Sequence, residues 1–314
     1  MSQPIASRPK ASSKLELIKR DFRVNKGIYL ILAPVLLYFI IFNYLPMFGI
    51  VIAFQDFVPR KGVFGSDWVG LSNFLDFFKS VYFGRLLRNT FLMSFYDLLW
   101  GFPMPIILAL LLNEIKNGLF KRSVQTLSYM PYFISTVVIA KMISDFTQSN
   151  GAITDLLVFF GGNRVNMLGE SNFFRSIFVG SNIWQGIGFG SIIYLAALSG
   201  VDQELYEAAV LDGANRWKQT VHITMPGIAP TIIIMLILRI GTLLYVGFDK
   251  IILLYGPSTY ETADVISSFV FRKGLIEANY GYSAAVGLFN SVVNLALLIT
   301  ANKISRRYSE TSLF

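Results

Sequence analysis

Charged residues are almost absent from six long apolar stretches of this chain of 314 residues. A helix needs about 20 mostly apolar residues to cross the hydrocarbon core of a bilayer, and backbone groups left unpaired there cost several kcal/mol each. Each stretch is therefore predicted to be a membrane-spanning helix. The six predicted spans cover residues 27–54, 89–113, 123–147, 176–199, 226–248 and 279–302. This pattern indicates an all-α, polytopic membrane protein.

The composition excludes most other classes of protein. Hydrophobic residues make up 54% of the chain and charged residues only 15%, whereas about a quarter of the residues in a soluble domain are charged. The chain has no cysteine and one histidine, His222, which excludes disulfide frameworks, thiolate zinc sites and most histidine-dependent hydrolysis. The membrane surface explains the net charge of +8 better than nucleic acid does. We therefore predict no catalytic residue, no metal site and no nucleic-acid partner.

Lysine and arginine residues outside the spans predict the orientation, because cytoplasmic loops carry an excess of them. Fifteen lie on the side of the N-terminal tail and nine on the other side, so both termini are predicted to be cytoplasmic. Residues 1–26 are predicted to form a basic tail, residues 27–304 the transmembrane domain and residues 305–314 a second tail. The first apolar stretch is longer than the core of a cleaved signal peptide, about 7–15 residues, and is predicted to be a retained anchor.

The connections predicted on the outer side are long. Residues 55–88 mix glycine and proline with aromatic residues, which predicts an ordered loop with a short amphipathic helix at the membrane interface. Residues 148–172 and 249–279 are long enough to form an outer cap.

The connection between the fourth and fifth spans has the pattern of two short helices joined by a glycine. Asp202 is a predicted N-cap for a helix that continues through Leu211. Gly213 permits a sharp reversal, Asn215 is predicted to cap a second helix, and Pro226 to end it. This elbow either inserts into a groove on a partner protein or packs on its own bundle, and the residues alone favour neither alternative.

The same connection resembles the cytoplasmic signature of a known family. Binding-protein-dependent, ATP-driven importers carry Glu-Ala-Ala, three residues, Gly, nine residues and Ile-x-Leu-Pro in each permease. This chain has Glu207-Ala-Ala209, Gly213 and Ile223-Thr-Met-Pro226 at that spacing, with Met225 in place of leucine. Further segments resemble the carbohydrate permeases of this class, and within them the oligosaccharide branch: Tyr44–Phe54, Leu87–Thr90, Phe102–Glu114 and Ser128–Ser135.

This resemblance implies a type I ABC importer permease in a bacterial cytoplasmic membrane. Its implied partners are a second homologous permease, two ATPase subunits that use ATP and Mg²⁺, an extracellular lipid-anchored or periplasmic solute-binding protein, and an oligosaccharide. The chain itself is expected to bind no cofactor, because it has no Gly-Lys pair and so no phosphate-cradling P-loop. The implied ATPase-coupling residues are Glu207, Ala208, Ala209, Asp212, Gly213, Ala214, Ile223 and Pro226.

Sugars are bound by planar polar groups and aromatic faces, so the candidates for the substrate pathway are such residues in the last three spans: Trp184, Gln185, Tyr194, Arg239, Tyr245, Asn290 and Asn294. Asn290 and Asn294 share a helix face, and asparagines at that spacing are more often hydrogen-bonding groups between helices than ligand contacts. Arg239 is predicted near the middle of the fifth span, where a charge costs at least ~2.5 kcal/mol on insertion scales. It contacts either an acidic sugar or an ion-pair partner, which is Asp97 or a residue of the second permease.

Two other classes of membrane protein remain alternatives. A secondary carrier or channel needs intramembrane ionisable relays or broken helices, and the spans offer chiefly Asp97 and Arg239. An intramembrane enzyme needs a catalytic or metal-ligand set, which one histidine outside the spans does not supply. Binding to an ATPase subunit separates the importer from both.

Overall fold

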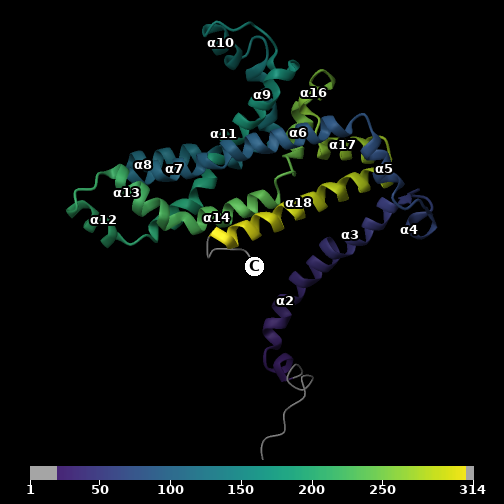
Figure 1. The fold of residues 1–314 in the computed structure, drawn as a ribbon, viewed down its shortest axis with the longest axis horizontal. Helices are drawn as coiled ribbons and strands as arrows, with labels where there is room; N and C mark the ends of the chain where they lie inside the picture. The colour runs from purple at the N-terminus through teal and green to yellow at the C-terminus, as the bar shows by residue number, and fades with distance from the viewer. Residues whose placement is uncertain (1–19, 309–314) are drawn as a thin grey trace, which may run out of the picture. The chain divides into compact units, whose positions relative to one another are not determined.

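The computed structural model describes residues 20–308 of the chain. The described part is almost entirely helical, as predicted, and divides into two units after Val51. Four helices are long and apolar enough to cross a membrane, and the number is six if each of two bent helix pairs forms one span. Figure 1 shows the helices in chain order from purple to yellow.

The first unit is one long helical stretch. It begins with α2 (Lys26–Phe39), passes through a π-helical turn (Ile40–Tyr44) and α3 (Leu45–Met47), and continues into a 3-10 turn (Phe48–Phe54) that extends across the unit boundary. None of the residues of α2 is buried. The helix therefore presents apolar side chains all round, which is expected of a span whose surroundings are lipid or another chain.

The second unit begins with a short hairpin. β1 (Gln55–Asp56) pairs in antiparallel register with β2 (Asp67–Trp68), and α4 (Gly62–Gly65) lies between them. These two-residue strands are a small departure from the all-α prediction. The predicted amphipathic helix is α5 (Ser72–Lys79), which buries Phe77.

The core of the second unit is a set of long helices around α11 (Ser171–Ser199). α11 contacts α7 (Pro103–Glu114), α8 (Leu119–Tyr129) and α14 (Met225–Gly241), and α14 lies along α18 (Tyr280–Tyr308). α6 (Phe83–Tyr96) continues through a π turn (Asp97–Gly101) into α7. The helix thus begins six residues before the second predicted span.

The third predicted span is not one straight helix. α8 ends in a 3-10 turn (Met130–Phe133), and α9 (Thr136–Thr147) then starts in a direction that differs by 102°. Pro131 lacks the N–H needed to continue α8, and Ser135 caps α9 by accepting a hydrogen bond from the backbone N–H of Val138. The predicted span over residues 123–147 is therefore bent at this point, because these two local signals interrupt the helix.

Three of the π turns share one cause. Each ends two residues before a proline, namely Pro46, Pro103 and Pro226. A proline ring inside a helix clashes with the carbonyl four residues earlier, and a wider turn at that point removes the clash. The expectation that Pro226 ends its helix was therefore wrong: α13 (Arg216–Gln219), the π turn (Thr220–Thr224) and α14 form one helical span of 26 residues.

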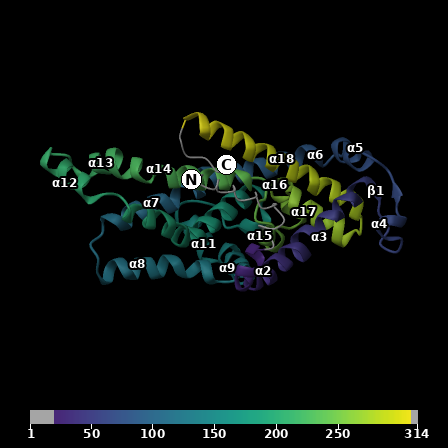
Figure 2. The ribbon, with the colours of Figure 1, turned by 90° about the horizontal axis from the view of Figure 1, so that it is seen from below.

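The remaining elements lie at the two ends of the second unit or connect its long helices. α12 (Gln203–Leu211) and α13 lie at one end of the second unit, and α5 and α17 (Ile266–Phe271) lie at the opposite end, as Figures 1 and 2 both show. α15 (Phe248–Leu254), which packs against α9, and α16 (Tyr260–Ala263), which packs against α11, connect α14 to α17. α10 (Ala152–Phe159) follows α9. A last π turn (Arg272–Ile276) leads to α18.

Candidate functional site

The first candidate site is the elbow formed by α12 and α13. Asp202 caps α12 by accepting a hydrogen bond from the N–H of Glu204 at 3.0 Å, and Asn215 caps α13 by accepting one from Lys218 at 2.9 Å. Gly213 has a φ of +76°, a left-handed conformation that a side chain resists. The sequence-predicted caps and reversal are confirmed.

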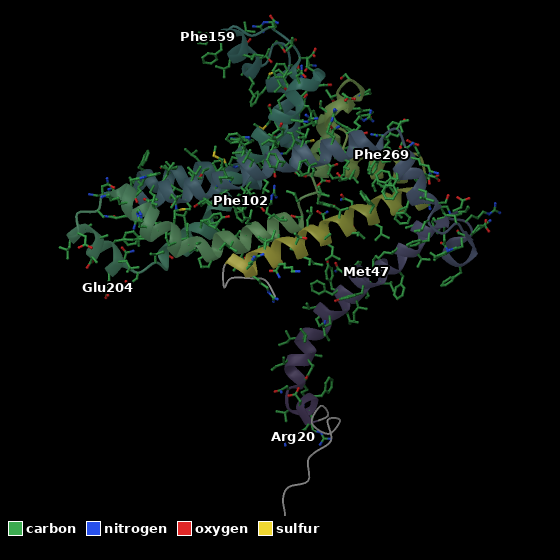
Figure 3. All side chains as sticks on the ribbon, viewed as in Figure 1. Arg20, Met47, Phe102, Phe159, Glu204 and Phe269 are labelled. Atoms are coloured by element: carbon green, nitrogen blue, oxygen red, sulfur yellow. The ribbon has the colours of Figure 1, made fainter. Side chains whose placement is uncertain are left out.

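The elbow presents most of its predicted coupling residues to the outside of the unit. Among them, Glu207, Ala208, Asp212, Gly213 and Pro226 are exposed, and Ala209, Ala214 and Ile223 are half-buried. Leu211 and Trp217 were not among the predicted coupling residues, yet they are 89% and 74% exposed. The labelled Glu204 marks this end of the unit in Figure 3. An exposed apolar pair beside several carboxylates is suited to contact with another protein.

Two contacts fix the elbow to the helix bundle. The hydroxyl of Tyr206 on α12 hydrogen-bonds to that of Thr224 in the π turn at 2.9 Å. Arg216 on α13 forms an ion pair of 2.5 Å with Glu114, the last residue of α7. The elbow therefore contacts both the helical span that contains α14 and the end of α7.

The second candidate site is a cavity of about 450 Å³ between α6, α7, α11 and α14. Four of the predicted pathway residues line it: Gln185, Tyr194, Arg239 and Tyr245. Trp184, Asn290 and Asn294 are not part of its lining. Phe102, labelled in Figure 3, also borders this space.

Arg239 forms an ion pair with Asp97, and both residues line the cavity. Asp97 is one of the two ion-pair partners that the sequence offers. α14 ends at Gly241, so Arg239 lies in its last turn rather than near the middle of the helix. Asp97 also accepts a hydrogen bond from Asn182 at 3.2 Å, and Asn182 accepts one from Lys250 at 2.7 Å. Sequence reasoning missed Asn182 and Lys250, because Asn182 is one polar residue among many and Lys250 was counted only as an outer charge.

Asn290 and Asn294 hold the chain where α14 has ended. Asn294 accepts a hydrogen bond from the N–H of Leu244 at 3.0 Å, and Asn290 donates one to the carbonyl of Leu244 at 3.5 Å. These contacts join α18 to the segment that follows α14, and the spacing of the two asparagines favours such a contact over a ligand.

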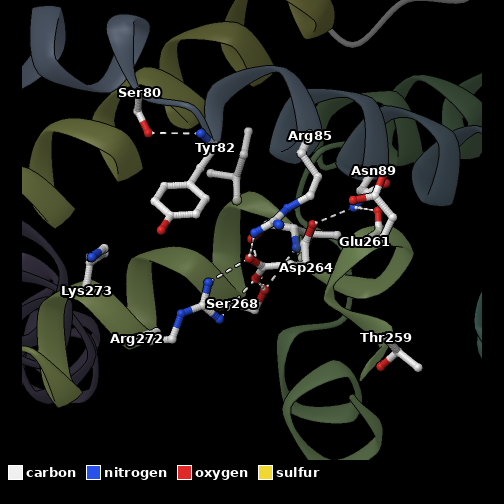
Figure 4. Close-up of polar contacts among 12 residues, drawn as sticks. Ser80, Tyr82, Arg85, Asn89, Thr259, Glu261, Asp264, Ser268, Arg272 and Lys273 are labelled. Carbon is white, nitrogen blue, oxygen red and sulfur yellow. Dashed lines mark hydrogen bonds and ion pairs between the residues drawn. The ribbon is translucent and has the colours of Figure 1, made fainter. Parts of the chain in front are cut away.

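A polar network joins α6 to the segment that contains α16 and α17 (Figure 4). Asp264 is completely buried and accepts hydrogen bonds from Arg85, Ser268 and Arg272. Asn89 donates to the carbonyls of Glu261 and Asp264, at 2.9 and 3.0 Å. Burial disfavours the charged form of Arg272, but Asp264 outweighs this effect and raises the pKa of Arg272 above its ordinary value.

This network explains the segment Leu87–Thr90, which the resemblance had marked without giving it a role. Asn89 also accepts a hydrogen bond from Arg175 of α11 at 2.8 Å, and the hydroxyl of Thr90 accepts one from the N–H of Ile266 at 3.0 Å. Both side chains are buried. They connect α6 to three other elements and serve the fold rather than a ligand.

Within residues 20–308, no three side chains of the histidine, cysteine, aspartate and glutamate types gather as a metal site would require. The two candidate sites are an exposed elbow and a polar cavity between long helices. Together with several apolar spans, they define a membrane permease rather than a soluble binding protein.

Comparison with known proteins gives the family. Residues 101–310 match the family described as the binding-protein-dependent transport system inner membrane component. The chain belongs to this family: it is a permease subunit of an ABC importer, a membrane component and not an enzyme.

Relatives of known sequence and structure agree over almost the whole chain. It is 44% identical to Protein LplB of Bacillus subtilis (strain 168), over 99% of this chain and 97% of that one. It is 43% identical to the polygalacturonan/rhamnogalacturonan transport system permease protein YteP of the same strain, over 92% and 91%. A chain of the bacterial alginate ABC transporter, solved in complex with an alginate pentasaccharide-bound periplasmic protein, matches with a TM-score of 0.87 and 42% identity, over 96% of this chain and 100% of that chain.

Proposed function

We propose that this chain forms, with a second homologous permease, the translocation pathway for an oligosaccharide in a bacterial cytoplasmic membrane. An extracellular solute-binding protein, lipid-anchored or periplasmic, delivers the sugar. Two ATPase subunits on the cytoplasmic side hydrolyse ATP with Mg²⁺. Residues 27–304 form the transmembrane domain, both termini are cytoplasmic, and the tails are residues 1–26 and 305–314, most of which lie outside the described residues.

The elbow of residues 200–226 is the observation that carries the coupling part of this proposal. Ala208 is exposed on α12 and lets another backbone approach closely, and Glu207 offers a carboxylate to an arginine of the partner. Leu211 and Trp217 add apolar area on either side of Gly213. We assign Glu207, Ala208 and Ala209 to the groove of the ATPase, and Asp212, Gly213 and Ala214 to the shape of the reversal.

Coupling through this elbow is a rigid-body mechanism. ATP binding draws the two ATPase subunits together, and each elbow follows the subunit that it contacts. Because α13 and α14 are parts of one helix and Arg216 pairs with Glu114, movement of the elbow turns α14 and α7 together. Nucleotide thereby shifts the equilibrium between inward- and outward-facing states, since it binds one of them better.

The oligosaccharide part of the proposal is supported by the cavity and by the relatives. Tyr194 and Tyr245 supply aromatic faces, and Gln185 supplies a planar amide along the lining. Two of the compared proteins are named for the transport of polysaccharides or their fragments. A cavity of about 450 Å³ is within the size range of ligand sites for small molecules.

Co-purification tests the coupling. The chain is expressed with its second permease and ATPase subunits, and the ATPase recovered with an affinity tag on this chain is measured. Ala208→Trp fills the space needed for close approach and is expected to lower recovery at least about tenfold, which corresponds to ~1.4 kcal/mol. Glu170→Ala, an exposed acid outside the elbow, serves as the control. Full recovery of the ATPase with Ala208→Trp would contradict the assignment.

A further inference from the structure

A continuous chain of four polar side chains crosses the wall of the cavity. Lys250 on α15 donates to the amide oxygen of Asn182 on α11 at 2.7 Å, and the amide nitrogen of Asn182 donates to Asp97 Oδ1 at 3.2 Å. Arg239 on α14 pairs with the other oxygen, Asp97 Oδ2. Lys250 has only donors, so it fixes the orientation of the Asn182 amide and directs the NH₂ group toward Asp97.

These four side chains together carry more positive than negative charge. Lys250 is 5% exposed, and its acceptors are Asn182 and, at 3.5 Å, the hydroxyl of Ser181. Among residues 20–308, Lys250 makes no ion pair. Asp97 is therefore the one carboxylate among the four side chains, which include two cations, Lys250 and Arg239. An uncompensated charge away from water is costly, and an anion that enters the cavity offsets part of this cost.

The cation that faces the cavity is Arg239. Its side chain is 49% exposed, whereas that of Asp97 is 11% exposed and is shared with Asn182. A guanidinium has five N–H donors in a planar fork, so the pairing with Asp97 leaves donors for a second acceptor. The buried hydroxyl of Ser94, on the lining one turn before Asp97, has no hydrogen-bond partner among the described residues. Both groups are suited to an oxygen-rich anionic ligand.

We propose that the cavity binds a sugar unit that bears a carboxylate, by transferring Arg239 from Asp97 to the substrate. Lys250 does not line the cavity and acts as a positioning residue: through Asn182 it holds Asp97 against α11 when Arg239 turns to the ligand. The substrate is therefore an acidic oligosaccharide, built of uronate units, and Arg239 is the residue that selects it. This inference rests on the proposed function, in which the cavity is part of the translocation pathway.

Direct binding to the assembled importer tests the proposal. The two permeases and the ATPase subunits are placed in nanodiscs without the solute-binding protein, so that its selectivity does not enter. The probes are trigalacturonate and its methyl ester, which has the same rings without the charges. Saturation-transfer NMR gives the dissociation constant of each, and the measured quantity is the preference for acid over ester.

Wild type is expected to prefer the acid. Arg239→Gln should lower this preference at least about tenfold, the effect of losing one charge-assisted hydrogen bond. Lys250→Met leaves the Arg239–Asp97 pair in place and should lower the preference about threefold without changing the affinity for the ester. Lys250→Arg keeps the charge and should restore the preference for the acid. If Lys250 served only the packing of the protein, keeping its charge would not restore this preference.

Equal affinity of wild type for acid and ester overturns the inference, as does an unchanged preference in Lys250→Met and Arg239→Gln. If Arg239→Gln does not assemble, Lys250→Met decides alone. Failure to bind either probe by an importer that retains its ATPase also overturns the inference and leaves the coupling assignment intact. Loss of the ATPase from wild type is a failure of the proposed function itself.

Discussion

Asn294 on α18 accepts a hydrogen bond from the backbone N–H of Leu244, which lies just beyond the end of α14. The apolar stretch that predicts the fifth span continues to residue 248, but the helix stops at Gly241. Backbone groups released by a break within a membrane must find partners in the protein. Asn294 and Asn290 supply them from the neighbouring span.

Asn294→Ala should therefore destabilise the protein. The N–H of Leu244 would lose its acceptor at a site where little water is present, at a cost of about 1–3 kcal/mol. The measurement is the midpoint of thermal unfolding in detergent, compared with that of Ser291→Ala. Ser291 is exposed on the same helix, and its hydroxyl donates a hydrogen bond to the carbonyl of Gly287 within that helix. Equal midpoints for the two variants would contradict the role given to Asn294.

Gly188→Ala should disrupt the packing of α11 against the end of α8. A Cβ atom at position 188 would overlap the carbonyl oxygen of Ser128, so backbone rather than a flexible side chain would have to shift. Overpacking of this kind costs about 1–3 kcal/mol or more. Gly180→Ala on the same helix meets nothing within 4 Å and is the matched control. We expect poor membrane yield and a lower unfolding midpoint for Gly188→Ala alone.

Asp264→Asn should loosen the segment between α15 and α18. The substitution leaves the buried ends of Arg85 and Arg272 without their counter-charge, and breaking a buried ion pair costs about 3–5 kcal/mol. Asp67→Asn removes a partner from the exposed pair with Lys61 and is expected to change stability by less than about 1 kcal/mol. Hydrogen exchange of residues 257–276 measures the difference. Unaltered protection in Asp264→Asn would mean that the network does not hold this segment.

Gly213→Val should separate ATP hydrolysis from uptake. A β-branched residue at a φ of +76° is strongly disfavoured, so the reversal between α12 and α13 would open. The protein should still insert, and the assembled importer should hydrolyse ATP without moving oligosaccharide. Gly200→Ala, at a φ of −90° in the same connection, is the control. If Gly213→Val transports as much oligosaccharide per ATP hydrolysed as the wild type, the elbow does not couple the two processes.

Local signals in the sequence predict the elements that depend on near neighbours. The long apolar stretches predict the helical spans because the chain must satisfy its own backbone hydrogen bonds in lipid. Asp202, Gly213 and Asn215 predict the elbow because each acts on residues within four positions of itself. The orientation of the termini rests on the distribution of basic residues and stays a prediction.

Tertiary contacts decide what local signals leave open. The sequence offers Arg239 two kinds of partner, and only the folded chain brings Asp97 to it across 142 positions. Lys250 has the pattern of an outer loop residue, yet the packing of α15 buries it beside Asn182. The physical reason is that a charge in an apolar stretch has a cost set by its position in the sequence, whereas the groups that offset this cost come from helices distant in the chain.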